Sequence, residues 1–102
     1  MYTYNAPLRD MQFVIEEVLG APAGWKQMPA FTDLDADTAR QILEEAGKFA
    51  SGVLAPMNSA ADLQGCTWRD GAVATPDGYR EAYRGFVEGG WAALACESEY
   101  GG

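Results

Sequence analysis

The sequence contains no histidine and few basic residues. Its 102 residues include 7 Lys and Arg against 15 Asp and Glu, which gives a net charge of −8 at pH 7. Nucleic-acid-binding proteins need a basic surface that displaces counterions from phosphates, and this chain lacks one. The same excess of negative charge disfavours binding to anionic membrane surfaces. Without histidine, neither a Ser-His nor a Cys-His catalytic pair is available.

Long apolar runs and a signal peptide are also lacking. No apolar run approaches the roughly 20 residues that a helix needs to cross a bilayer. Residues 1–7 have neither the basic start nor the apolar centre of a secretion signal. We therefore expect a cytoplasmic protein.

Cysteine is scarce. Cys66 and Cys96 lie far apart and belong to no CxxC or Cys/His pattern. A zinc site would have to be built largely from carboxylates, which suits zinc poorly. We expect both thiols to be reduced and structural, because free cysteine commonly serves as a small buried apolar residue.

Apolar residues, by contrast, are plentiful enough for folding. The chain is 48% hydrophobic and 12% aromatic, which distinguishes it from disordered sequences. Its length corresponds to one small domain or to part of a larger one.

Residues 8–19 are predicted to form the first helix. Their apolar members recur at the spacing of one helix face. These are Leu8, Met11, Val14, Ile15, Val18 and Leu19. Pro7 suits the start of this helix, and Gly20 followed by Pro22 suits its end. Phe13 lies off the main stripe, so we expect the helix to be covered on two sides.

A connector of residues 20–30 leads to the longest predicted helix. Acidic residues suit its start, because carboxylates accept hydrogen bonds from free backbone N–H groups. These are Asp33, Asp35 and Asp37. A long apolar face follows, made of Ala39, Ile42, Leu43, Ala46, Phe49, Ala50, Val53 and Leu54. On the polar face Glu44 and Lys48 stand at a spacing that supports a helix, and we expect the helix to end at Pro56.

The next segment predicts a loop and then a β-hairpin. Residues 58–65 are small and polar, which is typical of a loop. In residues 66–74, Asp70-Gly71 supplies the positive backbone angles of a tight turn, with Trp68 and Val73 on the two arms.

A third helix is predicted after the hairpin. Thr75-Pro76 is expected to cap and start it, and Gly89-Gly90 to end it. Its apolar face consists of Tyr79, Ala82, Tyr83, Phe86 and Val87. The apolar segment 91–96 then has no element to cover it, so we expect the polypeptide to continue into more protein.

The sequence offers only weak support for catalytic or binding residues. Five carboxylates could supply a general acid–base pair, namely Asp33, Asp35, Asp37, Glu44 and Glu45. We interpret them as helix caps and solvated surface. Five aromatic residues could stack on a ring such as a flavin, namely Trp25, Trp68, Tyr79, Tyr83 and Trp91. We interpret these as core residues. The glycine pairs lack the spacing of phosphate-binding loops. We predict no catalytic, cofactor-binding or metal-binding residue.

Several short segments match one known family in order and spacing. They are Tyr4–Phe13 (YNAPLRDMQF), Ala50–Asn58 (ASGVLAPMN), Asp70-Gly71, Thr75–Tyr79 (TPDGY), Glu88–Trp91 (EGGW) and Glu99–Gly102 (EYGG). On these segments the chain resembles the N-terminal region of the long bacterial acyl-CoA dehydrogenases, a group that includes 3-methylmercaptopropionyl-CoA dehydrogenase-like enzymes. Glu97-Ser98 replaces the proline that usually precedes the last motif, which affects one loop.

The resemblance implies a parent enzyme with a helical N-terminal domain, a middle β-domain and a C-terminal helical bundle, with FAD between them. Such enzymes convert acyl-CoA thioesters to 2-enoyl-CoA. A glutamate removes the α-proton, a hydride passes to the flavin, and an electron-transferring flavoprotein accepts the electrons. Those parts would lie beyond Gly102. The fragment is therefore expected to be structural, inactive by itself and free of cofactor, within a homo-oligomeric parent.

The expected fold is mainly α, with about three helices and a short β-hairpin. Residues 1–30 are expected to form an N-terminal extension, and residues 31–102 the start of the helical N-terminal domain, truncated at 102. The alternative is a stand-alone helical protein-interaction module that binds through its apolar stripes. A thiol-based redox protein is a third hypothesis. The preferred acyl chain stays open.

Overall fold

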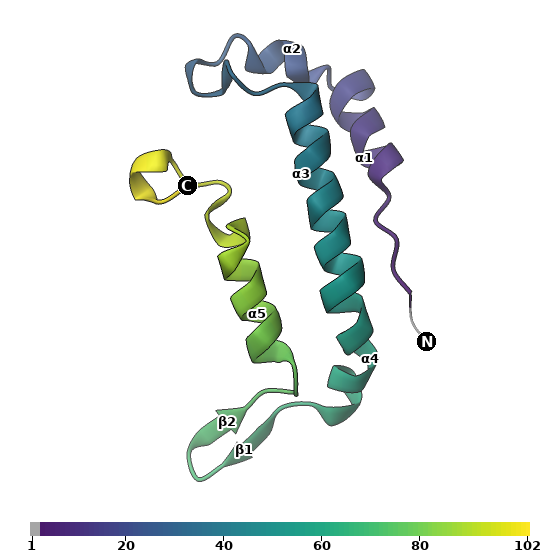
Figure 1. Ribbon diagram of the computed structural model, residues 1–102, viewed down its shortest axis with the longest axis vertical. Coiled ribbons are helices and arrows are strands. Elements are labelled where there is room, and N and C mark those ends of the chain that lie inside the picture. The colour runs from purple at the N-terminus through teal and green to yellow at the C-terminus, as the bar shows by residue number, and fades with distance from the viewer. Residues whose placement is uncertain (1–2) are drawn as a thin grey trace. The chain divides into compact units, whose positions relative to one another are not determined.

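The structure, a computed structural model, describes residues 3–102 and is mainly helical, with one two-stranded antiparallel sheet (Figure 1). The described residues divide into two compact units, residues 3–55 and residues 56–102. The predicted mainly α fold with a short hairpin is confirmed. It has more helical segments than the three expected, because the connector contributes a short helix and the longest helix has a further segment.

The first predicted helix is confirmed. Helix α1 (Leu8–Phe13) continues as a π-helical turn, η1 (Val14–Val18). The backbone N–H of Leu19 closes this turn by donating to the carbonyl of Val14 over 2.9 Å. Gly20 follows with a φ of 56°, a left-handed conformation that glycine adopts at little cost, and this ends the helix where the sequence predicted.

The connector of residues 20–30 is more ordered than expected. Helix α2 (Ala21–Trp25) lies within it, and the 3₁₀ turn η2 (Pro29–Phe31) extends one residue beyond its end. The sequence interpretation took Pro22 as a helix breaker. The structure instead places it in the first turn of α2, where its missing N–H has no helical partner to lose.

The longest helix begins as predicted but does not end at Pro56. Helix α3 (Ala36–Phe49) leads through the π-helical turn η3 (Ala50–Leu54) into α4 (Ala55–Gln64). The expected end at Pro56 and the expected loop at 58–65 are therefore wrong. In η3 the N–H of Ala55 donates to the carbonyl of Ala50, five residues back. This wider turn shifts the hydrogen-bond register just before the proline, which lacks an N–H of its own.

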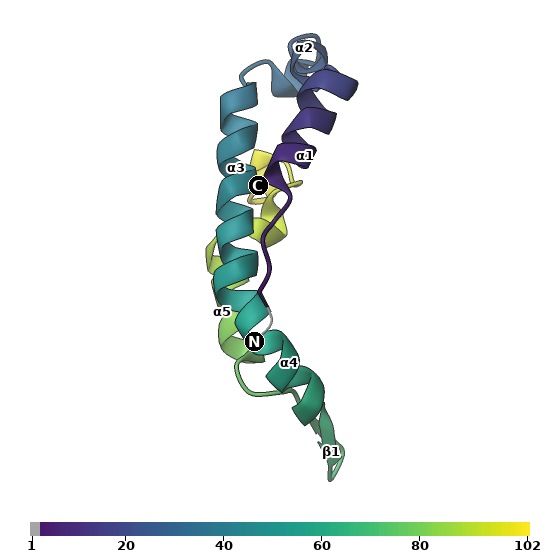
Figure 2. The same ribbon diagram turned by 90° about the vertical axis from the view of Figure 1, so that its right-hand side faces the viewer.

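In the first unit, the N-terminal segment and α1 lie along α3 in both views (Figures 1 and 2). Leu8 and Ile15 turn towards α3 and are half-buried. Gly47 permits the close approach, because a Cβ built at this position would lie 3.3 Å from the Cβ of Ala6 and 3.7 Å from a methyl group of Leu8. A residue without a side chain is thus needed where the extended segment crosses α3.

Gly47→Leu is expected to detach the N-terminal segment from α3. The added side chain overlaps Ala6 and Leu8, so the free energy of unfolding should fall by about 1–3 kcal/mol. Thermal melts would measure this loss, and limited proteolysis would show faster cleavage before Leu8. Gly52→Ala is the control, since nothing lies within 4 Å of a Cβ at Gly52. It should instead stabilise the helix by up to about 1 kcal/mol. Equal behaviour of the two variants would contradict the packing described.

The second unit contains the predicted hairpin. Strand β1 (Thr67–Arg69) pairs antiparallel with β2 (Ala72–Ala74), and Trp68 lies opposite Val73. Asp70 and Gly71 have φ angles of 52° and 80°. These positive values confirm the tight turn that the Asp-Gly pair predicted.

The third predicted helix starts later than expected. Helix α5 (Tyr79–Glu88) begins after Gly78, whose φ is 90°, so the predicted cap at Thr75 is wrong. Residues 76–79 form a turn instead, closed by a hydrogen bond of 3.3 Å from the N–H of Tyr79 to the carbonyl of Pro76. They are held by a hydrogen bond of 3.0 Å from the N–H of Asp77 to the side-chain oxygen of Gln64 at the end of α4. The predicted stop at Gly89-Gly90 is confirmed, and two 3₁₀ turns follow, η4 (Trp91–Ala93) and η5 (Ser98–Tyr100).

Residues 3–102 do not enclose a core of large side chains. The buried positions in this range are Ala55, Ala61, Pro76 and Ala82. By contrast, 17 large apolar residues of the same range are exposed. Soluble monomers rarely leave so much apolar surface uncovered. Within the described range, no helix combines the length and the apolarity that crossing a membrane requires.

Candidate functional site

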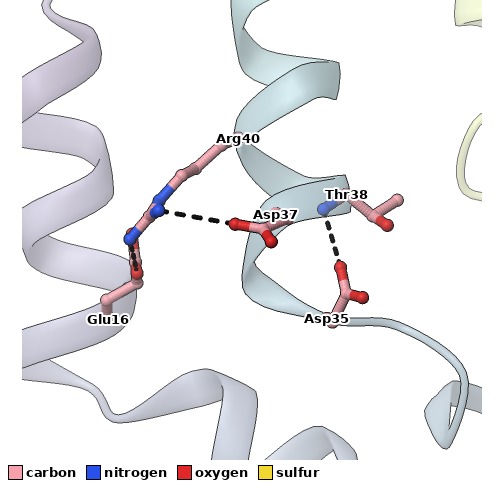
Figure 3. Close-up of polar contacts among 5 residues, drawn as sticks. All are labelled: Glu16, Asp35, Asp37, Thr38 and Arg40. Carbon is pink, nitrogen blue, oxygen red and sulfur yellow. Dashed lines mark hydrogen bonds and ion pairs between the residues drawn. The ribbon is translucent and has the colours of Figure 1, made fainter.

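The most connected polar group lies between η1 and α3 and is centred on Arg40 (Figure 3). The Arg40 guanidinium donates from Nε to one carboxylate oxygen of Glu16 over 2.9 Å, and from Nη2 to the other. Its Nη1 lies 3.5 Å from a carboxylate oxygen of Asp37 on α3. The hydrogen bond to Glu16 and the negative charge of that residue raise the pKa of Arg40. An arginine held in this way stays charged near neutral pH, so it joins η1 and α3 as a fixed cation.

Asp35 caps the N-terminus of α3, as the sequence predicted. One of its carboxylate oxygens accepts a hydrogen bond of 2.7 Å from the backbone N–H of Thr38 (Figure 3). This bond lowers the pKa of Asp35 below its ordinary value of 3.8, with smaller contributions from the Thr38 side chain and from Lys26. The hydrogen bonds from Thr38 and the charge of Lys26 favour the charged carboxylate, which is typical of a helix cap and not of a proton donor.

Asp35→Ala is expected to lower the helix content and the melting temperature of the chain. The pKa of Asp35 is lower in the folded state, so the cap stabilises fully above the ordinary value of 3.8 and is lost as the pH falls through the lower folded value. Asp35→Asn is the matched control, because asparagine keeps a capping oxygen but does not titrate. Circular dichroism at pH 7 and pH 2.5 should show that only the Asp35 chain loses this contribution in acid. Identical acid responses of the two chains would contradict the assignment.

The remaining candidate carboxylates are exposed and do not converge. Lys48 forms its ion pair with Glu45 over 2.6 Å, and Glu44, at the supportive spacing of four residues, acts on Lys48 only through its charge. The Glu45 carboxylate raises the pKa of Lys48, first by the hydrogen bond and then by its charge. Asp33 is exposed. Across residues 3–102, no three Cys, Asp or Glu side chains gather closely enough to hold a metal ion.

The candidate aromatic residues are spread over four elements, with Tyr79 and Tyr83 both on α5. Trp25 at the end of α2 and Trp91 in η4 are half-buried. Trp68, Tyr79 and Tyr83 are exposed, with exposed fractions of 72%, 45% and 68%, so their interpretation as core residues is wrong for the described chain. The ring of Tyr83 stacks on a neighbouring residue of α5, Phe86, with the centroids 6.4 Å apart.

The two cysteines are free and exposed. The expectation of buried structural thiols is therefore wrong for residues 3–102. Burial could not be inferred from sequence here, because Cys66 directly precedes an exposed hairpin and Cys96 lies in a turn.

An open groove of about 400 Å³ lies between the N-terminal segment and α3. It is lined by Asn5, Ala6, Leu8, Glu44, Gly47, Lys48 and Ser51. The lining offers no aromatic or arginine side chain and no glycine-rich loop at a helix N-terminus. These are the features by which proteins hold the rings and phosphates of a dinucleotide. The groove does not fit FAD.

Comparison with known proteins tests the family resemblance. No family model matches the chain. Its curated relatives, however, are acyl-CoA dehydrogenases, which confirms the family resemblance that the sequence motifs predicted.

Two of these relatives are specific enzymes. The chain is 38% identical to the 3-methylmercaptopropionyl-CoA dehydrogenase of Ruegeria pomeroyi over 103 aligned residues, which cover 98% of the chain and 17% of that protein. It is 28% identical to FadE5, a broad-specificity linear acyl-CoA dehydrogenase of Mycobacterium tuberculosis, over 104 aligned residues that cover the whole chain and 17% of that protein. The chain thus spans about one sixth of the length of the relatives it matches.

Proposed function

We propose that this chain is the N-terminal part of an FAD-dependent acyl-CoA dehydrogenase and serves a structural role in it. The observation that carries the proposal is the 38% identity to an acyl-CoA dehydrogenase along 98% of the chain. The parent enzyme would oxidise acyl-CoA thioesters to 2-enoyl-CoA. It would act in the cytoplasm as a homo-oligomer and pass electrons to an electron-transferring flavoprotein.

The exposed apolar surface supports the structural role. Chains that fold alone bury their large apolar side chains, whereas 17 of those in residues 3–102 are exposed. The remainder of the parent chain is the natural cover for this surface. In this proposal residues 1–30 form an N-terminal extension, and residues 31–102 begin the helical N-terminal domain.

The proposal places the redox chemistry outside this segment. FAD would supply that chemistry in the parent enzyme. Two observations support this placement: the groove beside α3 lacks suitable donors for the cofactor, and Asp35 and Glu45 act as a helix cap and an ion-pair partner. We therefore expect the isolated 102-residue chain to be colourless and inactive.

The visible spectrum of the protein from the uninterrupted reading frame tests the proposal. A flavin spectrum that bleaches when an acyl-CoA thioester is added is the expected result. Comparison of 3-methylthiopropanoyl-CoA with linear acyl-CoA would then rank the substrates. The first relative is named for the former substrate and the second relative for the latter. A protein that stays colourless with added FAD would overturn the proposal.

A stand-alone helical interaction module is the second candidate, favoured by the same exposed apolar residues. It predicts that the isolated chain is monodisperse and melts cooperatively. The structural role predicts self-association of the isolated chain through its uncovered apolar surface. Sedimentation velocity of the isolated chain at several concentrations separates the two.

A further inference from the structure

The N-terminal segment contacts α3 through one continuous row of side chains. Its half-buried residues alternate along the extended part and then follow the spacing of one helix face. They are Tyr4, Ala6, Leu8, Gln12, Ile15 and Glu16. Ile15 lines the same narrow recess as Ala39 and Leu43 of α3, and no residue of α1 or η1 is fully buried. We name residues 3–19 the N-terminal strap.

The ion pair that joins the strap to α3 has unequal partners (Figure 3). The side chain of Glu16 is 19% exposed, whereas that of Arg40 is 45% exposed. Arg40 also has a second carboxylate, that of Asp37, 3.5 Å from its Nη1. It therefore keeps a counter-charge if Glu16 is replaced. Glu16, by contrast, binds Arg40 with both carboxylate oxygens and loses this cation if Arg40 is replaced. A partly buried carboxylate without its cation is costly, because burial removes water from the charge.

The strap ends at a glycine with open surroundings. Gly20 has a φ of 56°, and nothing lies within 4 Å of a Cβ built there. Glycine passes between left-handed and right-handed backbone conformations at little cost. The helical part of the strap, α1 with η1, is shorter than the roughly 12–15 residues that an isolated helix needs in water. Separation from α3 should therefore also unfold this part.

We propose that the N-terminal strap opens from α3 as one unit about Gly20, and that Arg40 keeps it closed by neutralising Glu16. Opening would uncover the face of α3 around Ala39 and Leu43. Segments with few buried side chains open locally at a lower free energy than the whole protein. The inference depends on contacts within residues 3–55, so it does not rest on the proposed function.

Hydrogen exchange of the 102-residue chain tests the opening of the strap. Arg40→Met removes the cation and keeps a good helix former. The amides of residues 11–19 should then exchange about tenfold faster or more, the factor expected for losing a hydrogen bond to a charged group. The amides of residues 40–49 in α3 should keep their rates. Equal acceleration in both stretches would mean that the strap does not open by itself, and it would overturn the proposal. Unchanged exchange at residues 11–19 would also overturn it.

Two further variants test whether the charge of Glu16 is what Arg40 neutralises. Glu16→Gln combined with Arg40→Met leaves no carboxylate to neutralise, so the exchange of residues 11–19 should return to within about threefold of the unaltered chain. Asp37→Asn is the control, because Arg40 keeps its bonds to Glu16 and the strap should stay closed. A double variant that exchanges as fast as Arg40→Met, or a strap that opens in Asp37→Asn, would contradict the role assigned to Arg40.

Discussion

Replacing Phe49 or Phe86 by alanine should lower the free energy of unfolding of the parent enzyme by about 3–5 kcal/mol, the cost of removing a fully buried phenylalanine. Both residues are half-buried within residues 3–102. The same substitutions should therefore cost the isolated chain roughly half of the 1.5–3 kcal/mol that complete burial contributes. Thermal melts of each variant in the two contexts measure the difference.

The control for the phenylalanine variants is Leu63→Ala. Leu63 lies on α4 with an exposed fraction of 88%, so its truncation should leave the melting of the isolated chain nearly unchanged. If Phe49→Ala and Phe86→Ala cost the parent enzyme no more than the isolated chain, no further protein covers these faces. The structural role proposed above would then lose its main physical support.

Pro56→Ala should stabilise the helix that runs from α3 through α4, by up to about 3 kcal/mol. Pro56 is exposed, so its removal breaks no packing, and alanine restores a helical N–H donor. The wide turn of η3 would no longer be needed, and the new amide could donate to the carbonyl of Gly52. Chemical denaturation should show the gain in stability, and hydrogen exchange should show a protected amide at residue 56.

Pro29→Ala provides the comparison for Pro56→Ala. Pro29 occupies the first turn of η2, where its fixed φ angle suits the conformation and no helical N–H is lost. Its replacement should therefore be neutral or slightly destabilising, by less than about 1 kcal/mol. A destabilised Pro56→Ala chain would show that η3 serves a purpose that a regular helix cannot fulfil.

Local signals in the sequence predicted most helix and strand positions. Gly20 ended the first helix, Asp35 capped α3, and Asp70-Gly71 turned the hairpin, because each of these residues acts on backbone groups within a few positions of itself. The same local rules failed at Pro56 and Thr75. At Pro56 a π turn one residue earlier removes the conflict, and at Thr75 the side chain of Gln64 holds the following backbone in a turn.

In the candidate site, too, the sequence predicted some features and missed others. That Asp33, Asp37, Glu44 and Glu45 lie on the surface followed from their helix positions, and the structure agrees. Which charges pair did not follow. Glu16 and Arg40 are 24 residues apart, and Lys48 forms its hydrogen bond with Glu45 although Glu44 stands at an equally suitable helical spacing. No periodicity in the sequence encodes such contacts.

The sequence by itself determined the mainly helical class, the hairpin, the acidic character and the acyl-CoA dehydrogenase resemblance, because these depend on composition, local backbone preferences and the order of short motifs. Only the tertiary structure decided which apolar residues stay exposed. An apolar stripe on a helix predicts that this face is buried in the folded protein. It does not show whether the residues that bury it belong to the same segment of chain. In residues 3–102 the buried positions are small residues, whereas many large apolar side chains are exposed, a distribution that only three-dimensional packing determines.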